Sequence, residues 1–87
     1  MSQRRVEKMQ VKVRLFAGLR ERYGIDCRFV SVPDNTTVRE VWNLLLPGES
    51  FPDNVLAARN MEYVGYETAV AKDDEIAFFP PVTGGMS

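Results

Sequence analysis

One amphipathic helix constrains what the rest of this chain can fold into. Thr37 and Glu40 are spaced as in a capping box, in which each side chain accepts a hydrogen bond from the other residue's backbone N–H. Apolar residues then recur at the spacing of one helical face: Val38, Val41, Trp42 and Leu45. Pro47 and Gly48 end the pattern. We therefore predict a helix over residues 37–46 whose apolar stripe must pack against a second layer.

The rest of the chain carries the patterns of short strands and one brief helix. Within residues 9–16, apolar and polar side chains alternate up to Leu15, as in a half-buried strand. The predicted strands cover residues 9–16, 28–32, 55–59, 63–66 and 76–79. Residues 17–23 are predicted to form a short helix that Gly24 closes. We predict a turn at residues 60–62 and a polar, solvated turn at residues 72–74.

Only the helix over residues 37–46 has an apolar face large enough to cover a sheet. The economical architecture is therefore an α+β fold of two layers, with a mixed sheet packed on one main helix. The predicted core joins apolar residues of the strands to the helix stripe: Val11, Val13, Leu15, Val30, Val32, Ile76, Phe78, Val38, Val41, Trp42 and Leu45. This order of elements, with the final strand returning to the centre of the sheet, resembles the β-grasp or ubiquitin-like fold.

Composition argues against several classes of function. A formal net charge of −1 gives no electrostatic sign of binding to nucleic acid or to anionic membranes. With no histidine and one cysteine, the chain lacks an internal disulfide and Ser-His or Cys-His catalysis, and a transition-metal site is not expected. We interpret that cysteine, Cys27, as a small hydrophobe rather than a reactive thiol. The sequence shows neither a membrane-spanning run nor a signal-peptide pattern, so a cytoplasmic location is expected.

The most specific motif lies near the end of the chain. Residues 74–85 read Asp-Glu-Ile-Ala-Phe-Phe-Pro-Pro-Val-Thr-Gly-Gly, which resembles the end of the small subunit of molybdopterin synthase. Residues 11–21 resemble the opening strand and helix of the same family, the MoaD-type ubiquitin-like sulfur carriers of the MoaD/ThiS superfamily. The resemblance runs from Met9 to Gly85. A diglycine alone is weak evidence, whereas this run at the end of a β-grasp order is specific.

The resemblance implies a small subunit that is not an enzyme on its own and is activated by its partners. An E1-like adenylating enzyme (MoeB-type) would use ATP to adenylate the carboxylate of Gly85, and sulfur would then replace AMP to give a thiocarboxylate. The tail would enter the large subunit of molybdopterin synthase (MoaE-type), where sulfur passes to precursor Z in molybdenum cofactor biosynthesis. The resemblance implies no bound cofactor, no metal, and no nucleic acid or membrane partner.

The residue types of the tail suit this chemistry. Gly84 and Gly85, the expected catalytic positions of the carrier, have no Cβ to obstruct a narrow site. Prolines at residues 80–81 limit the freedom of the tail and so reduce the entropy lost on insertion. The residues expected to bind partners are Phe79, Pro80, Pro81, Val82, Thr83 and Phe16.

Two aromatic residues break the alternation of their strands. Phe16 and Phe79 fall on the polar faces of the first and last strands, which are neighbours in a β-grasp sheet. An exposed apolar patch beside the root of the tail indicates a docking surface. The alternative is that each ring only covers an edge of the sheet.

The expected domain organisation leaves one departure from the family. We expect residues 1–8 to form a disordered arm, residues 9–81 the β-grasp domain, and residues 82–87 a flexible tail with the diglycine. Met86-Ser87 follow Gly85, and a peptide bond cannot be adenylated as a free carboxylate can. Either a processing protease removes the two residues, or they are particular to this chain, or the protein serves another pathway that includes a processing step.

Two further classes of function stay open from the sequence. The chain could carry sulfur for cysteine, thiazole or tRNA thiolation, or act as a ubiquitin-like modifier conjugated to lysines. It could also be a plain β-grasp interaction domain whose tail is inert.

Overall fold

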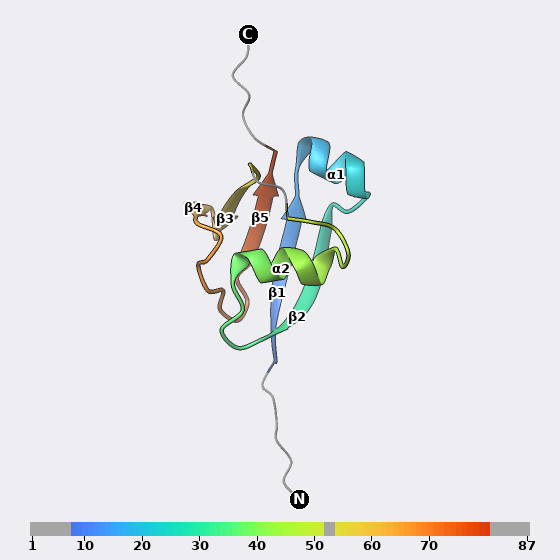
Figure 1. Ribbon diagram of the computed structural model, residues 1–87. Helices are drawn as coiled ribbons and strands as arrows, with labels where there is room; N and C mark the ends of the chain where they lie inside the picture. The colour runs from blue at the N-terminus through green and yellow to red at the C-terminus, as the bar shows by residue number, and fades with distance from the viewer. Residues whose placement is uncertain (1–7, 52–53, 81–87) are drawn as a thin grey trace, which may run out of the picture.

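The chain folds into one mixed sheet with a helix across one face (Figure 1). A computed structural model describes residues 8–51 and 54–80 of the 87-residue chain. The elements, in chain order, are β1 (Lys8–Leu15), α1 (Ala17–Tyr23), β2 (Cys27–Pro33), α2 (Val38–Leu45), β3 (Leu56–Arg59), β4 (Glu62–Val64) and β5 (Glu75–Phe79). The strands lie in the order β2-β1-β5-β3-β4. The predicted two-layer α+β architecture is confirmed.

The main helix begins with the capping box that the sequence predicts. The backbone N–H of Glu40 donates to Thr37 Oγ1 at 3.2 Å, and the N–H of Thr37 donates to Glu40 Oε1 at 3.0 Å. Two of the four N–H groups that a helix start leaves unpaired are thereby satisfied. The residues of the predicted stripe are buried: Val38, Val41, Trp42 and Leu45. The cap thus fixes where α2 begins and which face meets the sheet.

The core lies between α2 and the central strands. Trp42 is fully buried and makes edge-to-face contacts with Phe78 of β5, with Tyr23 at the end of α1, and with Phe51. Such aromatic pairs add about 0.5–1.5 kcal/mol beyond the area that they bury. Val30, which was predicted in the core, is only partly buried because β2 is an edge strand of the sheet.

Several strand boundaries differ from the prediction by one or two residues. β1 ends at Leu15, and Phe16 instead takes the N-cap position of α1. The predicted strand over residues 63–66 is β4, Glu62–Val64. Its start is set by the turn at residues 60–61, which pairs Arg59 with Glu62. Beyond β4 the chain turns away, and the hydroxyl of Tyr66 donates to the carbonyl of Val55.

The pairing of β1 with β5 determines which residues lie together at one edge of the sheet. These two central strands are parallel, and Leu15 of β1 is in register with Phe78 of β5. The N–H of Phe16 continues the pairing by donating to the carbonyl of Phe78 at 3.2 Å. Parallel strands end at the same edge of a sheet, so β5 ends beside the start of α1 (Figure 1). Pro80, which follows Phe79, therefore lies at this edge.

Candidate functional site: the open face of the sheet

Two aromatic rings meet on the face of the sheet opposite α2. Neighbouring side chains in a strand point to opposite faces, so Phe79 lies on the open face because Phe78 lies in the core. The rings of Phe16 and Phe79 stack with centroids 4.8 Å apart and planes 5° apart. Both residues are partly exposed. The sequence prediction that these two rings are neighbours is therefore correct.

The stacked rings form one wall of a shallow hollow of about 280 Å³ on this face. Its lining also includes Ala58 of β3 and Ala77 of β5, small residues that leave room above the sheet. Tyr63 forms another wall, is 72% exposed, and lies 6.1 Å from Phe79 between ring centroids. An apolar hollow with exposed aromatic walls is typical of a surface that a partner covers.

One side of the hollow is polar. Arg14 Nη1 lies 3.4 Å from Glu75 Oε2, and the guanidinium carbon of Arg14 lies 5.2 Å from the centroid of the Phe16 ring. Both charged side chains are more than one-third exposed, so the ion pair adds little to stability. Its position instead gives the apolar hollow a charged border along β1 and β5.

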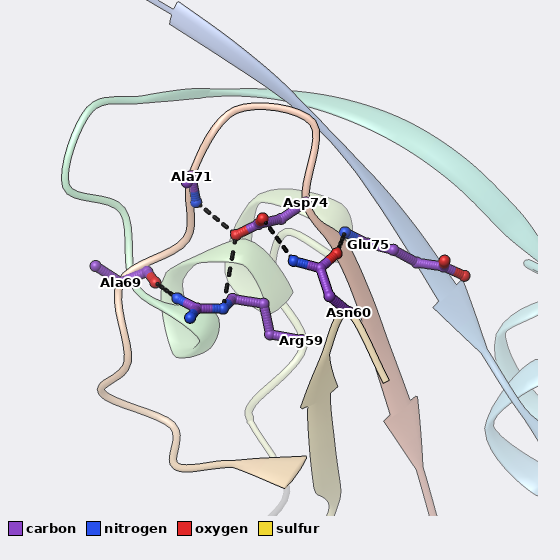
Figure 2. Close-up of polar contacts among 6 residues, drawn as sticks. All are labelled: Arg59, Asn60, Ala69, Ala71, Asp74 and Glu75. Atoms are coloured by element: carbon purple, nitrogen blue, oxygen red, sulfur yellow. Dashed lines mark hydrogen bonds and ion pairs between the residues drawn. The ribbon is translucent and has the colours of Figure 1, made fainter. Parts of the chain in front are cut away.

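Below the hollow, a polar network fastens the β3–β4 turn to the start of β5 (Figure 2). In the predicted solvated turn, Lys72 and Asp73 are exposed, but Asp74 is only 7% exposed, which corrects the prediction for that residue. Asp74 Oδ1 accepts a hydrogen bond from Asn60 Nδ2 at 2.9 Å, and Asp74 Oδ2 accepts one from the N–H of Ala71 at 2.7 Å. Asn60 Oδ1 in turn accepts from the N–H of Glu75 at 2.9 Å. Both oxygens of the Asp74 carboxylate thus accept hydrogen bonds, and this allows the carboxylate to be buried.

Arg59 adds two further polar contacts to this network (Figure 2). Its Nε lies 3.8 Å from Asp74 Oδ2, and its Nη1 donates to the carbonyl of Ala69 at 2.9 Å. The end of β3 and the turn that follows it are thereby joined to the loop before β5 and the first residue of β5, which are distant from them in the sequence. The network thus fixes the β3–β4 turn, whose Met61 lines the hollow.

The structure places only some of the predicted site residues, and their roles stay predictions. Phe16 and Phe79 come together, and Pro80 follows β5 directly and is partly buried. The remaining predicted residues lie outside the described residues: Pro81, Val82, Thr83, Gly84 and Gly85. Cys27 is exposed, on the edge strand β2.

The two most exposed residues of the hollow were not among the site residues predicted from the sequence. Tyr63 and Met61 line it together with Phe79, and both are strongly exposed. Tyr63 faces the same side as Ala58 because the two residues are partners in the β3–β4 register. The hairpin is the sequence feature that could have identified these two residues. Once residues 60–61 are assigned to the turn, the alternation of side chains along the strand places Tyr63 on the open face.

The described part of the chain shows no cluster of three or more His, Cys, Asp or Glu residues that could hold a metal ion. Within the same residues, no helix is long and apolar enough to cross a membrane.

Comparison with known proteins decides the family. The ThiS family matches residues 13–85. The chain belongs to the ThiS family. Within it, the molybdopterin synthase sulfur carrier subunit of Escherichia coli (strain K12) is 36% identical over 85 residues, a match that covers 86% of this chain and 99% of the relative. The resemblance to MoaD/ThiS sulfur carriers is thus confirmed.

Solved structures of similar proteins confirm the β-grasp fold of this ThiS-family chain. SAMP1 of Haloferax volcanii, a small archaeal modifier protein, aligns with a TM-score of 0.72 at 31% identity, over 87% of this chain and 99% of its own. A putative molybdopterin converting factor, subunit 1, of Pyrococcus furiosus aligns with a TM-score of 0.68 at 27% identity, over 85% and 99% of the two chains.

Proposed function

We propose that this protein is the sulfur-carrier subunit of a molybdopterin synthase, and that Gly85 is the residue that carries the sulfur. The observation that supports this most strongly is the position of the apolar hollow at the end of β5. The residues that lead to the diglycine follow directly after Phe79, the last residue of β5. A partner that covers the hollow therefore receives the root of the tail at a fixed place. The same function also appears in the names of two relatives, whose matches cover 86% of this chain and 99% of each relative.

The proposed chemistry places activation in the partner and presentation in this chain. An E1-like adenylating enzyme (MoeB-type) joins the Gly85 carboxylate to AMP from ATP and releases pyrophosphate. A sulfur donor then displaces AMP, which leaves a thiocarboxylate on Gly85. The large subunit of the synthase (MoaE-type) accepts the tail, and the sulfur passes to precursor Z.

The described residues contribute docking and orientation to this scheme. The stacked rings of Phe16 and Phe79 supply apolar area that a partner can bury at about 25 cal/mol per Å². Pro80 is partly buried at the end of β5, and its ring fixes its own backbone φ. The path of the tail is thereby restricted from its first residue. Less conformational freedom is then left to lose when the tail enters a partner.

The chemistry requires Gly85 to be the terminal residue. Met86-Ser87 follow Gly85 in the sequence, so we propose that a protease removes the residues after Gly85 before adenylation. The free carboxylate that this cleavage exposes is the group that the adenylating enzyme needs.

An intact-mass experiment tests the proposal. The protein that ends at Gly85 is incubated with the E1-like enzyme, ATP and a sulfur donor, and we expect a mass increase equal to one exchange of oxygen for sulfur. The product should then support molybdopterin formation with the large subunit and precursor Z. An unchanged mass would refute the carrier function. A thiocarboxylate that the large subunit does not use would assign the carrier to another sulfur pathway, and lysine-linked conjugates would indicate a modifier.

A further inference from the structure

The turn between β3 and β4 carries a strained residue that the fold does not need. Asn60 and Met61 both have left-handed backbone angles, with φ of 51° and 73°. A two-residue hairpin turn of this kind favours Asn followed by Gly, because glycine has no Cβ to clash in the left-handed region. Met61 occupies the glycine position and contributes nothing to the core, since it is 91% exposed. Both its backbone and its exposed apolar side chain are unfavourable in the isolated domain.

The strain persists because the turn is held at several points (Figure 2). The N–H of Asn60 donates to the carbonyl of Glu75 at 2.8 Å, and the Asn60 amide bonds both Asp74 and the N–H of Glu75 at 2.9 Å. Strained backbone survives where the surrounding structure over-determines it, and such sites are frequent at binding surfaces. Met61 is therefore fixed in place by its neighbour and cannot relax by moving the turn.

The side chain of Met61 borders the hollow. It lines the same depression as Phe79, Tyr63 and the small residues Ala58 and Ala77. Methionine is flexible and polarisable, and it packs well against irregular apolar or aromatic partners. A glycine at this position would remove the apolar side chain that extends the wall formed by Tyr63.

We propose that Met61 is a partner-binding residue: the strained turn holds it at the border of the hollow, where it packs against an apolar side chain of the synthase large subunit. This inference rests on the proposed function, because it takes the large subunit as the protein that covers the hollow. The continuity of Met61 with the Phe16–Phe79 stack through one apolar depression makes an apolar contact the fitting one. The side chain of Met61, which is exposed to water in the isolated domain, would then become buried when the complex forms.

The chain offers a matched control for the strain. Asp73 also has a left-handed backbone, with φ of 68°, in an exposed turn. Its N–H donates to the carbonyl of Gln10 at 2.9 Å, and its side chain does not line the hollow. The substitution Asp73→Gly relieves the same kind of strain and leaves the proposed contact surface unchanged.

The test compares thermal stability and affinity for the purified large subunit in one set of variants. We expect Met61→Gly and Asp73→Gly to raise the melting temperature by a few degrees, up to roughly 8 °C, as the left-handed strain is relieved. Met61→Gly should weaken binding about tenfold or more, because the apolar side chain no longer becomes buried. Met61→Asn, which tolerates the backbone but is polar, should weaken binding similarly. Met61→Leu should stay within about threefold of the wild type, and Asp73→Gly should bind as the wild type does.

Three outcomes would overturn the inference. Wild-type affinity in Met61→Gly would show that this side chain makes no contact that matters. A lower melting temperature in Met61→Gly would show that the turn is not strained by its methionine. Equal losses of affinity in Met61→Gly and Asp73→Gly would assign the effect to the fold rather than to a contact.

The same experiment separates this inference from the proposed function. If the wild type binds and Phe79→Ala weakens binding while the Met61 variants do not, only the inference about Met61 fails. If the wild type does not bind the large subunit, the proposed function and this inference fail together.

Discussion

Replacing the buried carboxylate Asp74 by asparagine tests the polar network at the start of β5. The two side chains have almost the same shape, so packing is retained and only the hydrogen bonding changes. Asp74 uses both oxygens as acceptors, one for Asn60 Nδ2 and the other for the N–H of Ala71. An asparagine has a single acceptor oxygen, and its NH₂ group must face one of these two donors in either orientation.

The cost can be worked out from these contacts. One hydrogen bond to a charged group is lost, worth about 1.5–3 kcal/mol, and one buried donor is left without an acceptor. Asp74 also loses its attraction to the guanidinium of Arg59, whose Nε lies 3.8 Å away. We expect Asp74→Asn to lower the free energy of unfolding by about 2–3 kcal/mol. In a domain of this size, that loss lowers the melting temperature by roughly 10–20 °C.

The assay is thermal and urea denaturation followed by the fluorescence of Trp42, which is fully buried in the core. Asp73→Asn is the control, because it removes the same charge from the neighbouring residue, which is exposed. Its effect should stay within about 0.5 kcal/mol. The reasoning is refuted if Asp74→Asn is as stable as the wild type, or if Asp73→Asn loses as much stability.

Three further predictions follow from the same structure. Phe79→Ala should weaken binding to the large subunit about 30-fold in a calorimetric titration and keep a cooperative melt, and an unchanged affinity would contradict the docking surface. Thr37→Ala should lower the free energy of unfolding by about 1 kcal/mol in urea, since the start of α2 loses its cap; Thr37→Ser, which retains the cap, should not. A chain that ends at Gly85 should be adenylated without a protease, whereas a chain that retains Met86-Ser87 should show no adenylate by mass spectrometry until it is cleaved.

The sequence predicted best those features that depend on neighbours along the chain. The capping box of Thr37 and Glu40 and the burial of Trp42 follow from spacing within one helix, so local physics was sufficient. Phe16 and Phe79 are far apart in the sequence, and their position on neighbouring strands was predicted only because the resemblance to a β-grasp fold supplied the order of strands; the stacking of their rings was not predicted.

The features that the sequence did not predict depend on the register between strands. Asp74 looked like a solvated turn residue because its partner Asn60 is 14 positions away, and nothing local shows that the two meet. Met61 and Tyr63 could be assigned to the open face only after the hairpin turn was fixed at residues 60–61. Val30 follows the strand alternation, but its partial exposure reflects the place of β2 at the edge.

The central position of β5 has a consequence for how the protein is made. The strand that joins β1 to β3 is the last of the five in the chain, so the sheet cannot close until most of the chain has been synthesised. Phe16 is synthesised early and can form the aromatic stack only after Phe79 has been added. A chain cut short by the ribosome or by a protease before Glu75 would lack the stack and the hollow together. Such fragments would be unable to occupy the partner in place of a chain that bears its diglycine.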